Sequence, residues 1–401
     1  MVNPQSFKRE IIGAALLLGL GGCATVNLPN VTQDCYSIED DERRLFKRAD
    51  EFVEIFDPSE HVYREPDLEG YLNRVAHQLL TEDLRQSGIA IAVKVINDPS
   101  FNALSLPNGR IYIHLGLLAA LDNEAQLATL LAHEMTHVFH RHALKQFRSV
   151  INKSALMSVS AVAAGVVAGA AGAMLVQTAV ISSIYGFSKD LEFEADEKGF
   201  QMIARNGYDV GESKKTFEHL KEFIEEEDVK QPFFFSTHPQ VVGRIKKYTE
   251  LLNSLPAGKI GTKINIEEFN RLTRDIPLKN VQLCLQMGMF KTAQRNVEKF
   301  ISLHPAQAQG FFYRGEIYRQ RQDPKKKEKT RDKSADYSEA LKAYDQAIAY
   351  DDRLALAYKG KAQILQKQGV WNEAKQAYRR YLELNLQAED KAYIEQFLKS
   401  E

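Results

Sequence analysis

Apolar and polar positions divide the chain into stretches of different character. An uncharged apolar run covers residues 11–22, and apolar residues recur at helical spacing through residues 123–142. Residues 154–188 contain no charged residue, and residues 274–388 repeat a helical-hairpin spacing. This pattern predicts a leader segment, a polar-faced helix, an uncharged insert and a repeat domain, in that order.

The leader has the features of a secretory signal, because Lys8 and Arg9 precede an apolar run too short for a comfortable membrane span. It ends in Leu-Gly-Gly-Cys at residues 20–23, which resembles a bacterial lipobox, where cleavage leaves the cysteine as a lipidated first residue. Lipidation of Cys23 would anchor the protein without a transmembrane helix. Because Ala24 rather than Asp follows, we expect attachment to the outer membrane, facing the periplasm. The alternative is an ordinary signal peptide that contains a cysteine.

Composition narrows the class of protein. The 401 residues are 44% apolar and 26% charged, which suits two or three globular domains. Lys and Arg number 52 against 53 Asp and Glu, and this balance argues against a general nucleic-acid binder. The three cysteines are too few for a disulfide scaffold or an all-cysteine zinc module. With Cys23 lipidated, Cys35 and Cys284 would either pair in an oxidising compartment or remain separate thiols.

The second stretch carries the candidate chemistry. A capping box and apolar residues at the 3.6-residue period predict the helix: Asn123, Gln126, Leu127, Leu130, Leu131, Met135 and Val138. His133 and His137 are four apart on one face, where two ligands of a tetrahedral zinc would converge. Glu134 could take a proton from a metal-held water without being a ligand. His140 and His142 are interpreted as charges at the helix C-terminus. The alternative for the whole motif is a chance match on a polar helix.

A third ligand is available on a second helix, residues 188–199. Glu192 and Asp196 are four apart and share a face, so Glu192 would complete a set of two His and one Glu. Asp196 would accept a hydrogen bond from the other ring nitrogen of a ligand histidine. Glu194 could take the ligand role by residue type alone, but it points about 160° away from Asp196 around the helix. The alternative is that the acidic run is a solvated helix face.

These two motifs together resemble the gluzincin metallopeptidases of the HtpX, Oma and CAAX-prenyl-protease group. The matching segments are His-Glu-Met-Thr-His at residues 133–137 and Leu-Glu-Phe-Glu-Ala-Asp-Glu-Lys-Gly at residues 191–199. The resemblance implies one Zn²⁺ per chain, with three ligands, one general base and one supporting carboxylate: His133, His137, Glu192, Glu134 and Asp196. It spans roughly residues 40–250.

A further segment resembles the substrate strand of that group. Residues 102–109, which lead into a strand at residues 110–114, match its Asn-Ala-x-Ser-x-Pro-x-Gly pattern. In the family this region forms the edge strand on which an extended substrate lies, which implies substrate contacts at Asn102 and Ala103. Leu104 replaces the usual aromatic residue, so the side-chain preference at that point stays open.

Another element resembles the Thr-His-Pro-x-x-x-x-Arg motif that sits over the active site in the periplasmic BepA type. It comprises residues 237–239 and Arg244. The resemblance implies that His238 latches the open zinc position and that Arg244 stabilises the oxyanion. Alternatively, His238 and Pro239 start a helix and Arg244 forms a salt bridge.

The uncharged stretch, residues 154–188, is long enough to span a bilayer but weakly hydrophobic for a span. We expect a pair of small-residue helices near the active-site cleft, in contact with the membrane or with a membrane-protein substrate. A buried helical hairpin and a true transmembrane span are the alternatives.

The C-terminal third resembles three tetratricopeptide repeats over residues 274–388, with a capping helix at residues 389–399. Three alanines take the small-residue position, spaced 47 and 34 residues apart: Ala293, Ala340 and Ala374. Stacked helix pairs would form a concave surface for a partner. The extra 13 residues, 324–336, are expected to form an exposed basic loop, which is solvated or contacts acidic phospholipid heads.

The predicted fold is an α+β metallopeptidase domain, mostly helical with a small sheet, followed by an all-α tetratricopeptide-repeat solenoid. The expected segments are a signal peptide, a linker, the peptidase domain, a connector and the repeats: 1–22, 23–40, 41–255, 256–273 and 274–401. We expect a lipid-anchored periplasmic zinc endopeptidase that acts on misfolded or stalled outer-membrane proteins. The repeats would bring in substrates and assembly machinery, and nucleic acid is not an expected partner. The alternative is a chaperone or assembly factor whose protease is held latent.

Overall fold

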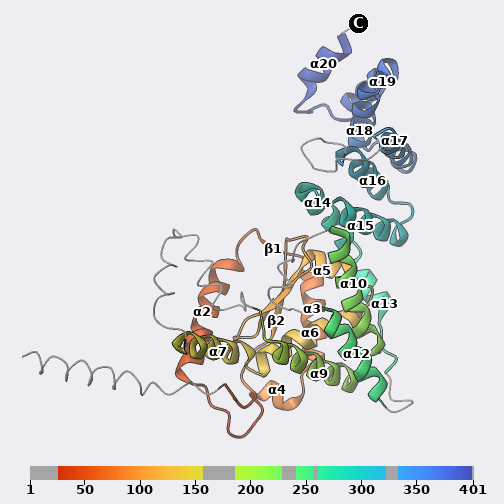
Figure 1. Ribbon diagram of the computed structural model, residues 1–401. Coiled ribbons are helices and arrows are strands. Elements are labelled where there is room, and N and C mark those ends of the chain that lie inside the picture. Colours follow the sequence, from red (N-terminus) through yellow and green to blue (C-terminus); the bar gives the residue numbers. More distant parts are fainter. Residues whose placement is uncertain (1–25, 157–185, 228–240, 256–260, 322–332, 400–401) are drawn as a thin grey trace, which may run out of the picture.

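The computed structural model describes residues 26–156, 186–227, 241–255, 261–321 and 333–399. Their helices and strands form two parts (Figure 1). The first is a body in which helices pack around a small sheet, and the second is an arm of antiparallel helices that extends away from one side of the body.

The described residues of the body contain one mixed sheet with the strand order β1-β2-β4-β3. Its strands are β1 (Val62–Tyr63), β2 (Ala92–Ile96), β3 (Ala103–Ser105) and β4 (Arg110–His114). β2 and β4 are parallel, whereas β3 is antiparallel to β4 with Ala103 opposite Ile113. Ile111 and Ile113 of the central strand β4 are fully buried. β3 therefore lies at an edge of the described sheet.

Helix α6 (Glu124–Phe139) runs through the middle of the body, and all of its residues are buried. Its N-terminus is capped as predicted, because the side chain of Asn123 accepts a hydrogen bond from the backbone N–H of Gln126 at 3.1 Å. The helices packed against it are α3 (Pro66–Leu79), α7 (His142–Leu156), α9 (Lys189–Arg205), α10 (Gly211–Glu227) and α13 (Ile266–Thr273). The other described helices of the body are α2 (Asp40–Phe56), α4 (Glu82–Gln86), α5 (Leu115–Ala120) and α12 (Val241–Ser254).

Helices α6 and α9 approach each other closely at Gly199. A Cβ atom at this position would lie 3.2 Å from the backbone nitrogen of His133, so a larger residue would push the helices apart. Glu192 lies two turns and Asp196 about one turn before Gly199, and both are buried against α6. The glycine thus sets the spacing between the two helices that carry the predicted site.

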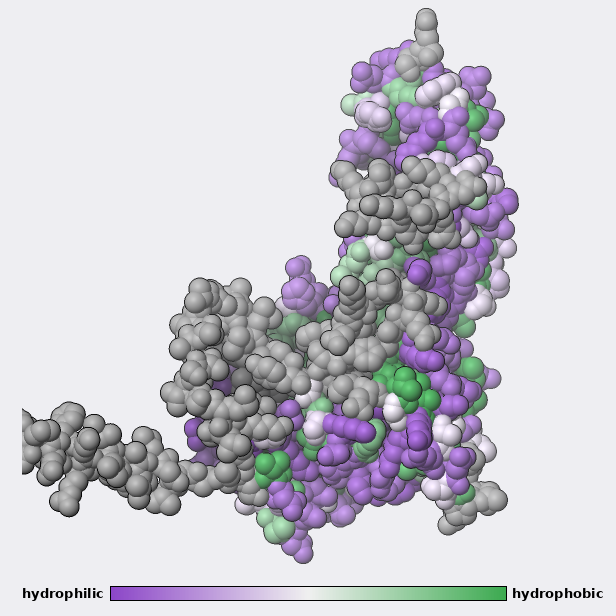
Figure 2. All heavy atoms as spheres, in the orientation of Figure 1, coloured by the Kyte–Doolittle hydropathy of each residue, from purple (hydrophilic) through white to green (hydrophobic). Residues whose placement is uncertain are grey.

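In the described residues the arm consists of three helix pairs and a final helix. The pairs are α14 (Ile276–Met287) with α15 (Phe290–Leu303), α16 (Ala308–Gln320) with α17 (Lys333–Tyr350), and α18 (Ala355–Lys367) with α19 (Trp371–Leu384), followed by α20 (Lys391–Lys399). Ala293, Ala340 and Ala374 lie in α15, α17 and α19 and are fully buried between helices. The predicted fold class, an α+β domain followed by an all-α repeat region, is confirmed. On the face shown in Figure 2, hydrophilic residues cover most of the arm.

Tyr344 of α17 fills the space between successive helix pairs and is fully buried. Glycines on both neighbouring helices make room for its ring, since Cβ atoms at Gly315 and Gly360 would lie 2.6 and 2.4 Å from ring atoms. Its hydroxyl donates a hydrogen bond to Glu316 at 2.6 Å. The stacking of the arm therefore depends on glycine at these crossings.

Lys299 of α15 ties the arm to the body. Its ammonium donates hydrogen bonds to the carbonyl oxygens of Ala119 and Leu121, at 3.1 and 2.5 Å, and lies 3.2 Å from Oδ1 of Asp122. Burial lowers the pKa of Lys299, and the charge of Asp122 opposes this shift. The arm is thus held to the segment that immediately precedes α6.

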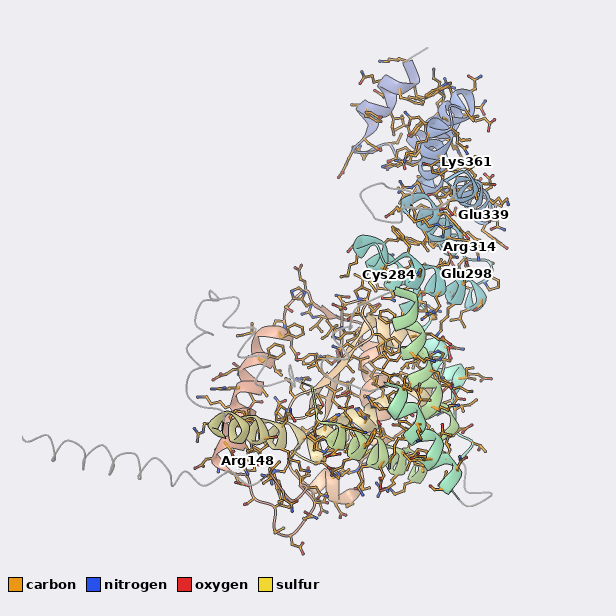
Figure 3. All side chains as sticks on the ribbon, in the orientation of Figure 1. Arg148, Cys284, Glu298, Arg314, Glu339 and Lys361 are labelled. Atoms are coloured by element: carbon orange, nitrogen blue, oxygen red, sulfur yellow. The ribbon has the colours of Figure 1, made fainter. Side chains whose placement is uncertain are left out.

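The predicted basic loop at residues 324–336 is wrong at its C-terminal end. The helix α17 begins at Lys333, and Asp336 is buried because its carboxylate accepts a hydrogen bond from Nε of Arg321 at 2.9 Å. Cys35 is exposed whereas Cys284 is buried in the arm (Figure 3), and no disulfide joins these two described cysteines.

Other predicted features lie outside the described residues. They are the signal peptide, the lipobox cysteine, most of the uncharged insert, the latch histidine and the start of the basic loop: residues 1–22, Cys23, 157–185, His238 and 324–332. In the part of the chain that the structure describes, no helix combines the length and apolar character needed to cross a membrane.

Candidate metal centre

Two histidines of α6 direct ring nitrogens at one point. His133 and His137 are one helical turn apart, and their Nε2 atoms are 3.0 Å from each other. The two rings are nearly perpendicular, at 82°, and both residues are 2% exposed. The structure thus brings together the two predicted ligands of one helix, with water largely excluded.

Glu192 of α9 reaches the same point from the neighbouring helix. Its Oε1 lies 3.5 Å from Nε2 of His137 and its Oε2 lies 3.6 Å from Nε2 of His133. Tetrahedral Zn²⁺ at its usual bond lengths separates two ligand atoms by about 3.3 Å. The three observed separations bracket that value, and two imidazoles with one carboxylate are a donor set that suits Zn²⁺. These residues therefore fit the metal.

Asp196 supports His133 from behind. Its Oδ1 lies 3.1 Å from Nδ1 of His133, the ring nitrogen that faces away from the shared point. Burial raises the pKa of Asp196, but the charge of Arg244 and the hydrogen bond with His133 more than offset this and lower it to about 2. The carboxylate is therefore ionised, and it can hold the ring of His133 in one tautomer and orientation.

Arg244 of α12 joins the two acidic residues of α9. Its Nη2 lies 2.6 Å from Oδ1 of Asp196, and its Nη1 lies 3.1 Å from Oε2 of Glu192. The side chain is fully buried, and burial lowers its pKa less than the charges of Asp196 and Glu192 raise it. These contacts match the salt-bridge alternative for Arg244, and its role at an oxyanion stays a prediction.

Glu134 lies beside the ligand pair and is held from the sheet. It is fully buried on α6, and its Oε2 accepts a hydrogen bond from Oγ of Ser105 at 2.9 Å. Ser105 is the last residue of β3. The carboxylate predicted to act as a base is thus fixed in orientation by the edge strand.

Asn102 and Ala103, the two predicted substrate residues, lie at the start of β3, and both side chains are fully buried. The carbonyl of Asn102 accepts from the N–H of His114 at 2.9 Å, so its backbone bonds to β4. Because successive residues of a strand alternate, the backbone groups of Ala103 and Ser105 face the opposite side. Any substrate contact here would therefore use the backbone, and that role stays a prediction.

Sequence reasoning assigned no site role to His140, His142 or Glu194, yet they form a second polar group beside the centre. Nδ1 of His142 lies 2.8 Å from Nδ1 of His137, and the ring of His142 is fully buried. Burial lowers the pKa of His142 to about 4, against the raising effect of Glu194. The expectation that His142 is a helix-terminal charge is therefore wrong, because the ring is buried and neutral. The only sequence signal was its position five residues after His137.

The arrangement belongs to a known class of site. Metallopeptidases with the His-Glu-x-x-His motif hold their metal by two histidines of one helix and a residue from elsewhere, and keep the glutamate of that helix at the water. The body of this chain has the site of that class. Its residues 65–252 match the family model described as Peptidase family M48. The family resemblance stated from the motifs is confirmed.

Individual relatives are distant, and each matches only part of this chain. The Beta-barrel assembly-enhancing protease of Escherichia coli K12 is 27% identical over 211 residues, which are 49% of this chain and 41% of that protein. The Mitochondrial metalloendopeptidase OMA1 of Schizosaccharomyces pombe is 28% identical over 182 residues, 45% of this chain and 52% of that protein. The chain thus spans about half the length of the curated relatives it matches. A TPR2AB domain of yeast Sti1 in complex with pHSP90 aligns with a TM-score of only 0.26 and 10% identity, over 69% of this chain and 91% of that one.

Proposed function

We propose that the chain is a zinc-dependent endopeptidase of the bacterial cell envelope, which hydrolyses peptide bonds in misfolded or incompletely assembled membrane proteins. One observation carries the proposal. The ligand atoms of His133, His137 and Glu192 converge at separations that fit one tetrahedral Zn²⁺, and Glu134 is fixed next to them. A buried donor set of this kind, with a carboxylate beside it, is what metal-assisted hydrolysis requires.

Each residue has a defined task in this mechanism. Zn²⁺ held by the three ligands would supply a Lewis acid and a water whose pKa is lowered to about 7. Glu134 takes the proton of the attacking water and passes it to the leaving amine. Ser105 keeps the carboxylate of Glu134 aimed through its hydrogen bond. The substrate lies extended along β3, paired with the outward backbone groups of Ala103 and Ser105.

The cellular setting rests on the leader and on the relatives. The leader pattern supports export and a lipid anchor at Cys23, and hence attachment to the outer membrane on its periplasmic side. The Escherichia coli relative carries the name beta-barrel assembly-enhancing protease, which supports outer-membrane proteins and their assembly machinery as substrates and partners. The helical arm would recruit them.

The test is Glu134→Gln in the full chain, assayed for hydrolysis of an unfolded outer-membrane β-barrel protein. We expect the rate to fall by about 10²–10⁴-fold, the usual contribution of a general base, while zinc content stays at one per chain. The matched control is Glu267→Gln, at an exposed glutamate of α13, which should keep full activity. Undiminished hydrolysis by Glu134→Gln would refute the proposal.

The arm favours a second candidate function, a chaperone or assembly factor whose protease is held latent by His238. The supporting observation is that three stacked helix pairs are tied directly to the body through Lys299. In cells, Glu134→Gln separates the two functions. Retained support of outer-membrane protein assembly favours the chaperone, whereas loss of all function favours the protease.

A further inference from the structure

The ligand His137 has a second histidine on the side away from the metal. His142 is the first residue of α7, and its Nδ1 lies 2.8 Å from Nδ1 of His137. Its Nε2 in turn lies 3.3 Å from Oε2 of Glu194, a residue of α9. The other oxygen of Glu194 lies 2.6 Å from Nδ1 of His140. A polar chain therefore runs from the metal centre through His137 and His142 to Glu194.

The protons of this chain can be assigned from its contacts. Nε2 of His137 faces His133 and Glu192, so its lone pair serves the metal and the ring proton must sit on Nδ1. Only one proton fits between two Nδ1 atoms 2.8 Å apart, so Nδ1 of His142 is the acceptor. A proton on the ring of His142 then sits on Nε2, which lies 3.3 Å from Oε2 of Glu194. Each ring thus has one defined tautomer.

The backbone holds His142 in this position at a conformational cost. Arg141, between α6 and α7, has a φ of 57°, a left-handed conformation that is unfavourable for a non-glycine residue. Its guanidinium forms a two-point ion pair with buried Glu42 of α2, at 2.8 and 2.6 Å. Farther along α7, Arg148 pairs with Asp41 at 2.7 Å (Figure 3). Two ion pairs to the start of α2 therefore fix the reversal that turns His142 back under His137.

The same residues fit a chain of close polar contacts better than a second metal site. The 2.6 Å between His140 and Glu194 is the length of a charge-assisted hydrogen bond, and it is shorter than the about 3.3 Å between two ligands of one tetrahedral metal. A cation on Nε2 of His142 would also move the ring proton to Nδ1. It would then oppose the proton of His137 across 2.8 Å.

We propose that His142 is a positioning residue for the metal centre: it accepts the Nδ1 proton of His137 and is itself oriented by Glu194. The inference rests on the proposed function, in which His137 is a zinc ligand. Phe187 stacks on the ring of His137, with centroids 3.9 Å apart, so its face and its Nδ1 edge are both held. An outer partner of this kind raises the affinity of a site for its metal by about 10–100-fold.

The test compares two substitutions in the full chain. His142→Asn keeps an acceptor oxygen near the place of Nδ1, whereas His142→Leu keeps the bulk and removes the acceptor. Zinc dissociation constants are measured by chelator competition, with the melting temperature of the metal-free protein as a check on folding. We expect His142→Leu to weaken zinc binding by about 10–100-fold and His142→Asn to restore most of it. His114→Leu, which removes a histidine of β4 whose side chain is 11% exposed, is the control and should leave the affinity unchanged.

The outcomes separate this inference from the proposed function. Equal zinc affinity in wild type, His142→Leu and His142→Asn would overturn the positioning role alone. Equal weakening in both variants would overturn it too, because packing rather than the acceptor would then matter. A second zinc equivalent lost with His142→Leu would identify a metal site instead. A wild-type chain that binds no zinc would refute the proposed function itself.

Discussion

Arg244 and Asp196 form an ion pair from which water is fully excluded, with Nη2 of the arginine 2.6 Å from Oδ1 of the aspartate. The pair joins α12 to α9, and Asp196 at the same time contacts the predicted ligand His133. One buried carboxylate thus serves both the packing of two helices and the orientation of a ligand.

Breaking this pair is expected to destabilise the body strongly. Arg244→Met leaves Asp196 and Glu192 buried without their counter-charge, which costs about 3–5 kcal/mol. Chemical unfolding of the metal-free protein should show this loss, whereas Lys246→Met, at an exposed lysine of the same helix, should show none. The double variant Arg244→Met with Asp196→Asn should lose less than the sum of the two single losses. Additive losses would contradict a direct pair.

Ser105→Ala is expected to slow catalysis without releasing the metal. The hydroxyl donates to Glu134, and a hydrogen bond to a charged group is worth about 1.5–3 kcal/mol, so kcat should fall by about tenfold or more. Steady-state kinetics together with zinc content will distinguish this from loss of the site. Ser254→Ala, at an exposed position in α12, is the matched control. An unchanged kcat would mean that Ser105 does not orient the base.

The two zinc-site motifs were predictable from sequence because their geometry is local. In a helix, residues four apart share a face, so the spacing of His133 with His137 and of Glu192 with Asp196 translates directly into structure. The arm was predictable for a similar reason, since Ala340 and Ala374 repeat at the length of one helix pair.

What sequence could not predict depends on contacts between distant segments. The role of His142 follows from the reversal at Arg141, which is held by Glu42, 99 residues away. The start of α17 was misplaced because the burial of Asp336 requires Arg321, the residue that follows the last residue of α16. Neither partner leaves a periodic signal in the chain.

Gly199→Val is expected to weaken both zinc binding and stability. A side chain there meets the backbone of His133 at 3.2 Å or closer, so α9 must move away from α6 and carry Glu192 with it. Chelator competition and melting temperature should both report the change. Gly70→Ala is the matched control, since nothing lies within 4 Å of its added Cβ and alanine favours the helix α3. Wild-type zinc affinity in Gly199→Val would show that the helix spacing is not needed for the site.

Removal of the metal is expected to lower the melting temperature of the body. A ligand that binds only the folded state raises the free energy of unfolding by about 2.7 kcal/mol when its free concentration is one hundred times its dissociation constant. Differential scanning calorimetry with chelator and then with added Zn²⁺ should show a reversible shift. His133→Ala removes a ligand, and its melting temperature should not respond to Zn²⁺. A wild-type transition that is indifferent to Zn²⁺ would argue against a buried site.

Lowering the pH is expected to destabilise the arm, because Glu316 then becomes protonated. Burial raises its pKa, but hydrogen bonds from Arg319, Tyr344 and Gln320 and the charge of Arg319 lower it below the usual 4.5. A carboxyl whose pKa is depressed on folding stabilises above its unfolded value, and that stabilisation is lost as the pH falls through the folded value. The arm should therefore melt at lower temperature as the pH is taken below about 4.5, and less steeply so in Glu316→Gln. Parallel pH profiles for wild type and variant would exclude Glu316 as the source.

Ser105 belongs to β3 and touches Glu134, so a strand of three residues connects the sheet edge to the carboxylate. A peptide can add to such an edge only where its own backbone groups are unpaired. A protein that has completed its folding has already used those groups internally, whereas a stalled chain has not. Under the proposed function, the enzyme would therefore select its targets by their state of completion rather than by their amino-acid sequence, and a substrate would escape cleavage simply by finishing its own sheet.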